Sequence, residues 1–227
     1  MDNRNNIKKE INQWLESLTI PKKPNEFEVK QILKRMDIHV PDGIIVKNTS
    51  EIDLTDMEPP YVVKICSSDI HHKTELGGVL LNLNKDEVTD TIDKLSDKFM
   101  NSSFLIERQL KFSTTEFIIG GILDPVFGAA IMVGAGGILT EIYKDVSFRL
   151  VPCSKDDAVN MLDELLISPI LNGYRGLKIN KDALALILFK ISGFIELLGS
   201  SFSQLDLNPI VFDGDKWCVL DAKLFLK

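Results

Sequence analysis

The stretch from Tyr61 to Leu83 reads YVVKICSSDIHHKTELGGVLLNL and predicts two strands joined by a polar loop. Residues 61–66 are mostly apolar and follow a pair of prolines, whereas residues 79–83 follow a double glycine, and both boundaries are typical of strands. Lys64 lies inside the first strand. Because side chains alternate between the two faces of a strand, Lys64 is equally well explained as a solvent-facing residue or as a point charge for a phosphate.

The loop between these strands carries two of the three histidines of the chain, His71 and His72. Neighbouring side chains in an extended loop point in opposite directions, and neither histidine has a Cys or His partner at metal-ligand spacing, so we do not expect zinc. A neutral imidazole is a competent nucleophile toward a phosphoryl group. Lys73 would hold the phosphate, and Gly77 and Gly78 would let backbone amides approach it. By composition alone, an ordinary loop explains the segment at least as well.

A second glycine-rich segment, Gly134–Gly137, follows an apolar run. Such turns bind phosphates, but this spacing lacks the dinucleotide pattern and the lysine of a P-loop. Arg149 supports a phosphate-binding role for this segment. It lies in the apolar run of residues 146–151, where a guanidinium needs an anionic partner.

Two late strands, about 205–212 and 217–222, carry a third set of polar residues. Asp206 and Asn208 are two residues apart and therefore share one face of a strand. Asp221 lies on the next strand after a short turn. Carboxylate and amide oxygens suit Mg²⁺, whereas a turn would explain Asn208 but not an acid on each strand.

Composition limits the classes of protein that fit this sequence. The 227 residues carry a formal net charge of −7, with 44% hydrophobic and 26% charged residues, which is the balance of a globular protein. The acidic balance argues against a nucleic-acid or membrane-surface binder. Three widely spaced cysteines and a polar N-terminus predict a reduced, cytoplasmic protein. Residues 183–199 are strongly apolar but interrupted by Lys190 and Glu196, which favours a buried helix over a membrane span.

The pattern of the remaining chain predicts an α+β protein. Residues 5–18 have helical spacing and read as an appendage before the main domain. Further helices are expected from Glu26, around residues 88–99, after Ser154 and after Asn180, and Ser154 and Asn180 are suitable N-caps. Strands are expected at 43–47, 61–66, 79–83, 103–108, 114–122, 129–133, 146–151, 205–212 and 217–222.

Taken in order, these residues resemble the ATP-grasp β subunit of NDP-forming acyl-CoA synthetases, a group that includes the ADP-forming acetate–CoA ligases. That family has a strand lysine, then Ser-Pro-Asp-Ile-x-His-Lys, then a Gly-Gly-Val strand, which corresponds here to Lys64 through Val79. The resemblance covers about residues 24 to 226. Further matches follow in the same order: Glu116–Gly120, Asp124–Gly128, Gly134–Ile138, Glu141, Asp145, Arg149, Asn172–Gly176, Asp206–Pro209 and Asp221 with Ala222.

The resemblance implies an ATP-grasp fold, with two α+β lobes and the nucleotide between them. We expect an N-terminal helical extension at 1–23, a first lobe at 24–105 and a second lobe at 106–227. The implied reaction converts acyl-CoA, ADP and phosphate into a carboxylic acid, CoA and ATP. It passes through an acyl phosphate and a phosphohistidine on the partner α subunit and needs Mg²⁺. It also needs an α subunit that carries the CoA-binding domain, in an implied α2β2 assembly.

The resemblance also assigns roles to single residues. His72 corresponds to the histidine thought to relay the phosphoryl group to ADP, and His71 falls on a variable position. Lys64 corresponds to a nucleotide-phosphate lysine, and we also expect Lys73, Gly77, Gly78 and Arg149 to contact the nucleotide. The segment from Glu107 through Leu110 corresponds to the adenine-contacting hinge, and Glu116 to a ribose ligand. Asn208 and Asp221, with Asp206, correspond to the Mg²⁺ site.

Two departures from the family pattern keep other hypotheses open. Ser68 replaces the usual proline, which would leave the loop less rigid. Gln204 replaces a glutamate that commonly precedes the Asp-x-Asn-Pro run, so that Mg²⁺ affinity is expected to be weaker. A nucleotide-sensing subunit without turnover is therefore one alternative. The other is an ATP-grasp ligase that activates its carboxylate directly and forms no phosphohistidine.

Overall fold

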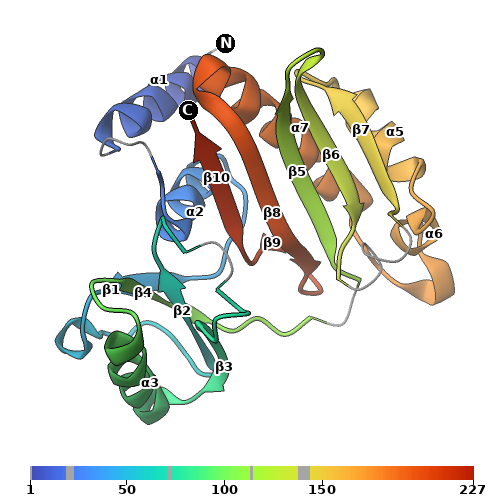
Figure 1. Cartoon of the computed structure of the whole chain (residues 1–227). Helices are drawn as coiled ribbons and strands as arrows, with labels where there is room; N and C mark the ends of the chain where they lie inside the picture. Colours follow the sequence, from blue (N-terminus) through green and yellow to red (C-terminus); the bar gives the residue numbers. More distant parts are fainter. Residues whose placement is uncertain (1, 19–22, 71–72, 113–114, 138–143) are drawn as a thin grey trace. The chain divides into compact units, whose positions relative to one another are not determined.

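The computed structural model describes residues 2–18, 23–70, 73–112, 115–137 and 144–227. These residues form two compact units (Figure 1). Unit 1 contains residues 1–24, 29–40 and 112–227, and unit 2 contains residues 25–28 and 41–111. Each unit has its own antiparallel sheet and its own hydrophobic core, as expected for a mixed α+β chain.

Unit 2 is built on a four-stranded sheet in the order β1-β4-β2-β3. The strands are β1 (Gly43–Val46), β2 (Tyr61–Cys66), β3 (Val79–Leu83) and β4 (Ser103–Arg108). Strand β2 lies between two neighbours, and every one of its residues is buried. Helix α3 (Lys85–Lys98) begins with a capping box between Asn84 and Glu87 and packs Val88, Ile92 and Leu95 against the sheet.

Unit 1 is built on a larger sheet in the order β10-β8-β5-β6-β7, with β9 paired to β8. Its strands are β5 (Phe117–Asp124), β6 (Gly128–Ala135), β7 (Val146–Leu150), β8 (Phe202–Phe212), β9 (Trp217–Val219) and β10 (Ala222–Leu226). The single strand predicted at 217–222 is thus two strands. The break falls at Leu220 and Asp221, directly opposite Pro209 and Asn208.

Helices cover one face of this sheet (Figure 1). They are α1 (Asp2–Ser17), most of α2 (Glu26–Arg35), α5 (Lys155–Asp163), α6 (Ser168–Leu171) and α7 (Lys181–Leu198). The predicted caps of α5 and α7 are confirmed: Ser154 accepts from Asp157 N, and Asn180 accepts from Ala183 N. The unit also contains short 3-10 turns at Tyr174–Gly176 and Gly199–Ser201, and unit 2 contains one at Thr49–Glu51.

Helix α7 is the most apolar segment of the protein. By length and composition alone, residues 181–201 would suffice to cross a membrane, but half of the most apolar window is buried inside the protein, and a core helix passes the same test. Nine of its residues are buried, including Leu188, Ile191 and Phe194. Lys190 does not disrupt this packing, because its Nζ donates to the carbonyl oxygen of Met36 at 2.8 Å, beyond the end of α2. The predicted buried helix is confirmed.

The boundaries of the units differ from the predicted lobes. A division between residues 105 and 106 would cut β4, which pairs along its whole length with β1 and β2. The N-terminal helix is also more than an appendage: Ile11 of α1 is fully buried, and Trp14 packs on Phe194 of α7 with ring centroids 6.5 Å apart. Helix α1 therefore belongs to the core of unit 1.

Candidate functional site

Unit 2 contains a buried cluster of charged side chains around Lys64. Its Nζ lies 2.8 Å from Oε1 of Glu26 and 2.8 Å from Oε2 of Glu107. Lys73 Nζ lies 2.5 Å from Oε2 of Glu26. All four side chains are less than a tenth exposed. Lys64 is therefore not a solvent-facing residue, and the structure brings together three of the predicted nucleotide contacts: Lys64, Lys73 and Glu107.

Glu26 is the residue of this cluster that the sequence did not identify as functional. It is the first residue of α2, where the free amides of the first turn favour a negative charge. Residues 25–28 belong with unit 2, and Glu26 is separated from Lys64 by 38 residues and from Lys73 by 47. The only available signal was that two lysines near an apolar strand require acidic partners. That signal does not say which acid.

The double glycine before β3 is explained by packing. A Cβ atom on Gly78 would lie 2.3 Å from Cδ1 of Ile65, so this position excludes larger residues. Gly77 adopts a left-handed conformation with φ +68, which favours glycine. The Gly77 and Gly78 amides donate to the carbonyl oxygens of Thr74 and Lys73 at 3.0 and 2.7 Å. Because these amides are used inside the turn, the glycines shape the loop around Lys73 instead of offering amides to an anion.

The predicted hinge begins inside β4. The Glu107 carboxylate faces Lys64, and the side chain passes over Gly43 on β1, where a Cβ atom would lie 2.8 Å from Glu107 Cγ. The next residues leave the sheet, with Gln109 N donating to the carbonyl oxygen of Pro60 at 2.8 Å. Leu110 is half-buried just beyond the strand. A contact of Glu107 with a base would therefore use its backbone, since its carboxylate already neutralises Lys64.

His71 and His72 lie outside the described residues, so the predicted role of His72 stays a prediction. The chain on either side is described. Ile70 packs against the core of unit 2, and Lys73 is held by Glu26. The residue that directly follows His72 is therefore fixed to the buried charge cluster.

The predicted metal ligands lie on the hairpin formed by β8, β9 and β10. The register pairs Asp206 with Lys223, and the N–H of Asn208 donates to the carbonyl oxygen of Asp221 at 3.2 Å. Cross-strand partners and residues two apart share a face, so Asp206, Asn208 and Asp221 stand on the same face of the sheet. The structure confirms this arrangement, because Leu205 and Leu207 point into the core between them.

Electrostatics at this hairpin suit a hard cation. Burial raises the pKa of Asp206; the charge of Lys223 lowers it, and that of Asp221 raises it. Asp221 Oδ1 is buried as well. The carboxylates of Asp206 and Asp221 repel each other, and a bound Mg²⁺ would reduce that repulsion. Together with the amide oxygen of Asn208 they form a set of oxygen donors that suits Mg²⁺, with water and phosphate oxygens completing the octahedron. No three His, Cys, Asp or Glu side chains converge within the described ranges, so such a site relies on Asn208 and the phosphates.

The position of Asp221 is supported by a lysine that the sequence analysis did not identify. Lys30 on α2 is 2% exposed, and its Nζ donates to the carbonyl oxygen of Leu220 at 2.7 Å. Leu220 N in turn donates to the carbonyl oxygen of Pro209 at 2.9 Å. The break between β9 and β10 is thus held from both sides, which fixes the backbone that presents Asp221 and Asn208.

Arg149 is not brought together with the predicted metal ligands. Register across β8, β5, β6 and β7 places Asp206, Gly120, Met132 and Phe148 in one row, and the neighbouring Arg149 on the opposite, helix-covered face. Its guanidinium forms a bidentate pair with Glu164, and its Nε lies 3.9 Å from Asp157 Oδ1. The hydrogen bond with Glu164 raises the pKa of Arg149. The anionic partner required by the sequence is therefore supplied by the protein itself.

Glu116 lies against the second glycine-rich segment. Its carbonyl oxygen accepts from Gly136 N at 2.6 Å, and a Cβ atom on Gly136 would lie 2.8 Å from the Glu116 backbone. Its Oε2 would be 3.3 Å from a Cβ on Gly137. These glycines therefore bring the turn close to the half-buried Glu116, whose predicted ribose contact stays a prediction.

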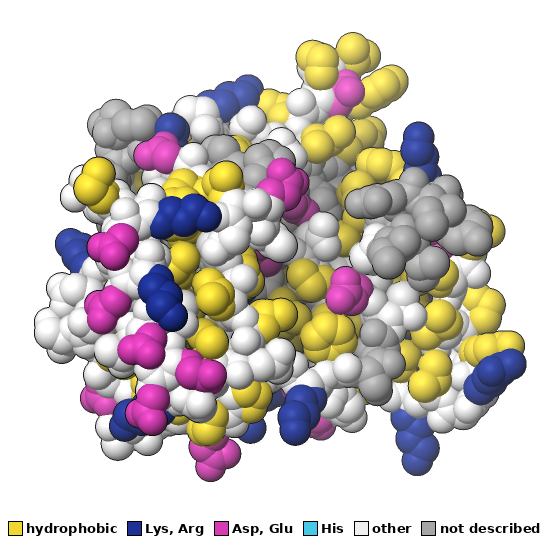
Figure 2. Space-filling view, turned by 60° about the horizontal axis from the view of Figure 1, so that its bottom comes forward, with side chains coloured by type: hydrophobic (Ala, Val, Ile, Leu, Met, Phe, Trp, Pro, Cys, Tyr) yellow, Lys and Arg dark blue, Asp and Glu magenta, His cyan; other side chains and the backbone are white. Residues whose placement is uncertain are grey.

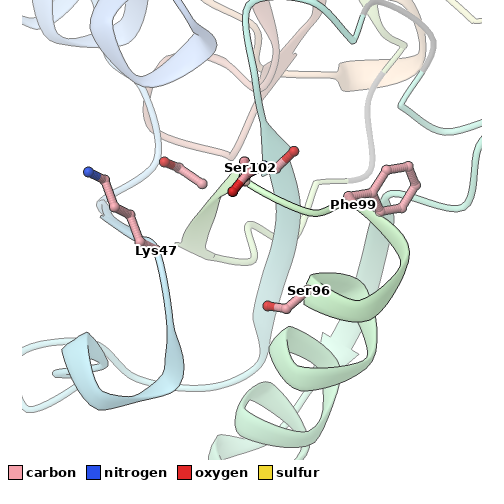
Figure 3. A pocket seen from close by; sticks show the side chains of 6 residues that line it. Lys47, Ser96, Phe99 and Ser102 are labelled. Carbon is pink, nitrogen blue, oxygen red and sulfur yellow. The ribbon is translucent and has the colours of Figure 1, made fainter.

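A surface pocket in unit 2 has a volume of about 380 Å³ (Figure 3). Ser96 and Phe99 come from the end of α3 and its C-cap, and Lys47 follows β1. None of the predicted site residues lines it.

The exposed side of α3 carries five acidic and three lysine side chains, and acidic side chains gather at the lower left of Figure 2. An acidic surface of this kind repels a polyanion such as a nucleic acid.

Comparison with known proteins places these features in a family. The model of the ATP-grasp domain family matches residues 21–226. The β subunit of acetate–CoA ligase [ADP-forming] I from Pyrococcus furiosus is 38% identical over 212 residues, which are 88% of this chain and 90% of that subunit. A crystal structure from Pyrococcus horikoshii superposes with a TM-score of 0.86 at 32% identity, covering 97% of this chain and 99% of that one.

A further structure comes from an acetyl-coenzyme A synthetase of Candidatus Korarchaeum cryptofilum. It superposes with a TM-score of 0.77 at 27% identity and covers 97% of this chain and 100% of that chain. It contains coenzyme A and Mg-AMPPCP, and its phosphohistidine segment points toward the nucleotide binding site. The chain belongs to the nucleotide-binding ATP-grasp family, among the homologues of the β subunits of ADP-forming acyl-CoA synthetases.

Proposed function

We propose that this chain is the nucleotide-binding β subunit of an ADP-forming acyl-CoA synthetase and that His72 carries the phosphoryl group. The proposed overall reaction converts acyl-CoA, ADP and phosphate into the free acid, CoA and ATP. Phosphate displaces CoA from the acyl group, and the acyl phosphate then transfers its phosphoryl group to a histidine of the α subunit, releasing the carboxylate. The P–N bond on that histidine breaks as the imidazole of His72 takes the phosphoryl group. In the last step the P–N bond breaks as an ADP oxygen takes the phosphoryl group.

The observation that carries the nucleotide role is the convergence of Lys64 and Lys73 on one buried carboxylate. One lysine lies on a central strand and the other directly follows His72 in the sequence, and Glu26 fixes both charges. Phosphoryl transfer depends mainly on positioning and charge neutralisation, which fixed lysines supply. The phosphohistidine segment named in the Korarchaeum enzyme supports the role of His72.

Mg²⁺ is the cofactor that the hairpin fits best. Asp206, Asn208 and Asp221 share one face and provide hard oxygen ligands, and the Korarchaeum structure contains Mg-AMPPCP. When bound, the ion neutralises charge on the phosphates. Asp206 and Asp221 would hold it, and Lys30 maintains the backbone at Leu220, beside Asp221.

The partner is proposed to be an α subunit that carries the CoA-binding domain, in an α2β2 assembly in the cytoplasm. The P. furiosus relative is named as a separate β subunit and matches this chain over 90% of its length. The test mixes this chain with a cognate α subunit, acyl-CoA, ADP, phosphate and Mg²⁺. ATP synthesis that is lost in His72→Ala supports the proposal. No synthesis, or synthesis unchanged in His72→Ala, overturns it.

One observation favours a second candidate, a nucleotide-sensing subunit without turnover. Gln204 is exposed on the same face as Asp206 and Asn208, so an amide stands in line with the metal ligands where the resembling family commonly has a carboxylate. Loss of that charge weakens the attraction for a divalent ion. Metal-dependent nucleotide binding without phosphotransfer in the presence of α subunits would support this candidate.

A further inference from the structure

The carboxylate of Glu26 lies between two lysines. Oε1 is 2.8 Å from Lys64 Nζ and Oε2 is 2.5 Å from Lys73 Nζ, so each oxygen serves a different cation. The Glu26 side chain is 1% exposed, and the two lysine side chains are 9% and 6% exposed. Such short, desolvated ion pairs interact strongly because little water screens them.

The charges within this group balance. Lys64 and Lys73 contribute two positive charges, and Glu26 and Glu107 contribute two negative charges. Glu107 contacts Lys64, whereas Glu26 contacts both lysines. The two cations that the proposed function assigns to a nucleotide phosphate are thus already neutralised by the protein.

This arrangement has a consequence for ligand binding. A phosphate that reaches either Nζ atom enters the field of the Glu26 carboxylate, which repels it. We infer that Glu26 is an internal counter-anion: it stabilises the lysine pair in the empty site and lowers the affinity of that site for nucleotide. This inference rests on the proposed function, because it takes the two lysines as phosphate contacts.

The chemistry of the site explains why such a residue is useful. Two buried lysines without an acid would carry a large desolvation cost, so an empty site needs a carboxylate. The first turn of α2 favours a negative charge at Glu26, beside the lysines. A nucleotide held by two uncompensated lysines would also leave slowly. Glu26 is therefore a positioning residue that limits how tightly the nucleotide is held.

The variant Glu26→Gln tests this inference, since it removes the charge and retains the size. Isothermal titration of the full chain with Mg·ADP should give a Kd about tenfold lower than that of the wild type. A residue with only a structural role would give an unchanged or higher Kd. Glu28→Gln is the matched control, because Glu28 lies in the same turn and its carboxylate accepts from Asn25 N instead of from a lysine. Its Kd should equal that of the wild type.

Thermal unfolding keeps the test decisive if Glu26→Gln folds poorly. The phosphates of Mg·ADP should replace the missing negative charge, so the nucleotide should raise Tm more in the variant than in the wild type, or restore a folded state that is absent without it. A smaller rise in Tm, or no recovery, overturns the inference. If the wild type itself binds no Mg·ADP, both the inference and the proposed function fail. If the wild type binds and Glu26→Gln binds no tighter, only the inference fails.

Discussion

The backbone N–H of Asn208 donates to the carbonyl oxygen of Asp221 at 3.2 Å, so the amide side chain of β8 stands opposite a carboxylate at the break between β9 and β10. The pairing is independent of any ligand, because it belongs to the strand register that also aligns Asp206 with Lys223. A preformed set of oxygen ligands requires little reorganisation when a cation arrives.

Asp221→Asn should weaken binding of Mg·ADP by about tenfold or more, because it removes an anionic oxygen from the proposed metal site. The loss should disappear when Kd for ADP is measured in EDTA. Asp215→Asn makes the same change on the exposed turn of this hairpin and should leave both values at the wild-type level. An equal loss with and without Mg²⁺ would show that Asp221 acts without a metal.

Asp206 should destabilise the metal-free protein at neutral pH. Burial raises the pKa of Asp206, so between the ordinary and the raised pKa the folded chain retains a proton that the unfolded chain has released. Stability must then fall as pH rises from the ordinary carboxyl pKa through the raised value. Without metal, Asp206→Asn should therefore unfold at higher denaturant concentration than the wild type near pH 7, and the difference should shrink toward about pH 4.

Denaturation curves in EDTA and in Mg²⁺ separate the two roles of Asp206. Mg²⁺ should stabilise the wild type and not Asp206→Asn, since the ion relieves the carboxylate repulsion. A variant less stable than the wild type at pH 7 without metal would contradict the electrostatic argument.

Gly78→Ala should destabilise the protein by about 1–3 kcal/mol, because the added Cβ would lie 2.3 Å from Cδ1 of the fully buried Ile65. Ile65→Val removes that atom, so the double variant should lose less stability than the sum of the two single variants. Gly193→Ala is the control: it lies within α7, a Cβ there would meet nothing within 4 Å, and it should be neutral or stabilising. If the stability losses of Gly78→Ala and Ile65→Val simply add, the turn accommodates the new Cβ atom without strain.

Features that depend on a single segment were predicted better than contacts between residues far apart in the sequence. The strands around Lys64, the caps at Ser154 and Asn180, and the shared face of Asp206 and Asn208 follow from local periodicity and were confirmed. The partner Glu26 could not be predicted, because nothing local marks an acid 38 residues away from Lys64.

Residues whose presence has both a ligand-binding and a structural explanation were also hard to assign from the sequence. The sequence identified Arg149 as a cation in need of an anion but could not show that Glu164 supplies it. Gly77 and Gly78 were assigned to a phosphate because glycine permits close approach, yet the structure uses Gly78 to accommodate Ile65. In both cases the sequence correctly indicated that the residue needs a special environment, and contacts within the fold provide it: an ion pair for Arg149 and close packing for Gly78.

Arg149→Gln should lower Tm and leave the Kd for Mg·ADP within about twofold of the wild type, because Arg149 lies on the helix-covered face and pairs with Glu164. Hydrogen bonds from Arg149 and Ser147 lower the pKa of Glu164, so this stabilisation is present at neutral pH and is lost as pH falls through the lowered value. The difference in Tm between the wild type and the variant should therefore shrink in acid. A large loss of nucleotide affinity would instead return Arg149 to the binding site.

The most direct test of the account is phosphoryl labelling of the chain with its α subunit and Mg·[γ-³²P]ATP. The account predicts an acid-labile, base-stable label on His72 that is absent in His72→Ala and present in His71→Ala. Addition of ADP should discharge it as labelled ATP, since P–N transfer is reversible. No label, or a label that persists in His72→Ala, would contradict the relay and favour a subunit that binds nucleotide without passing on its phosphate.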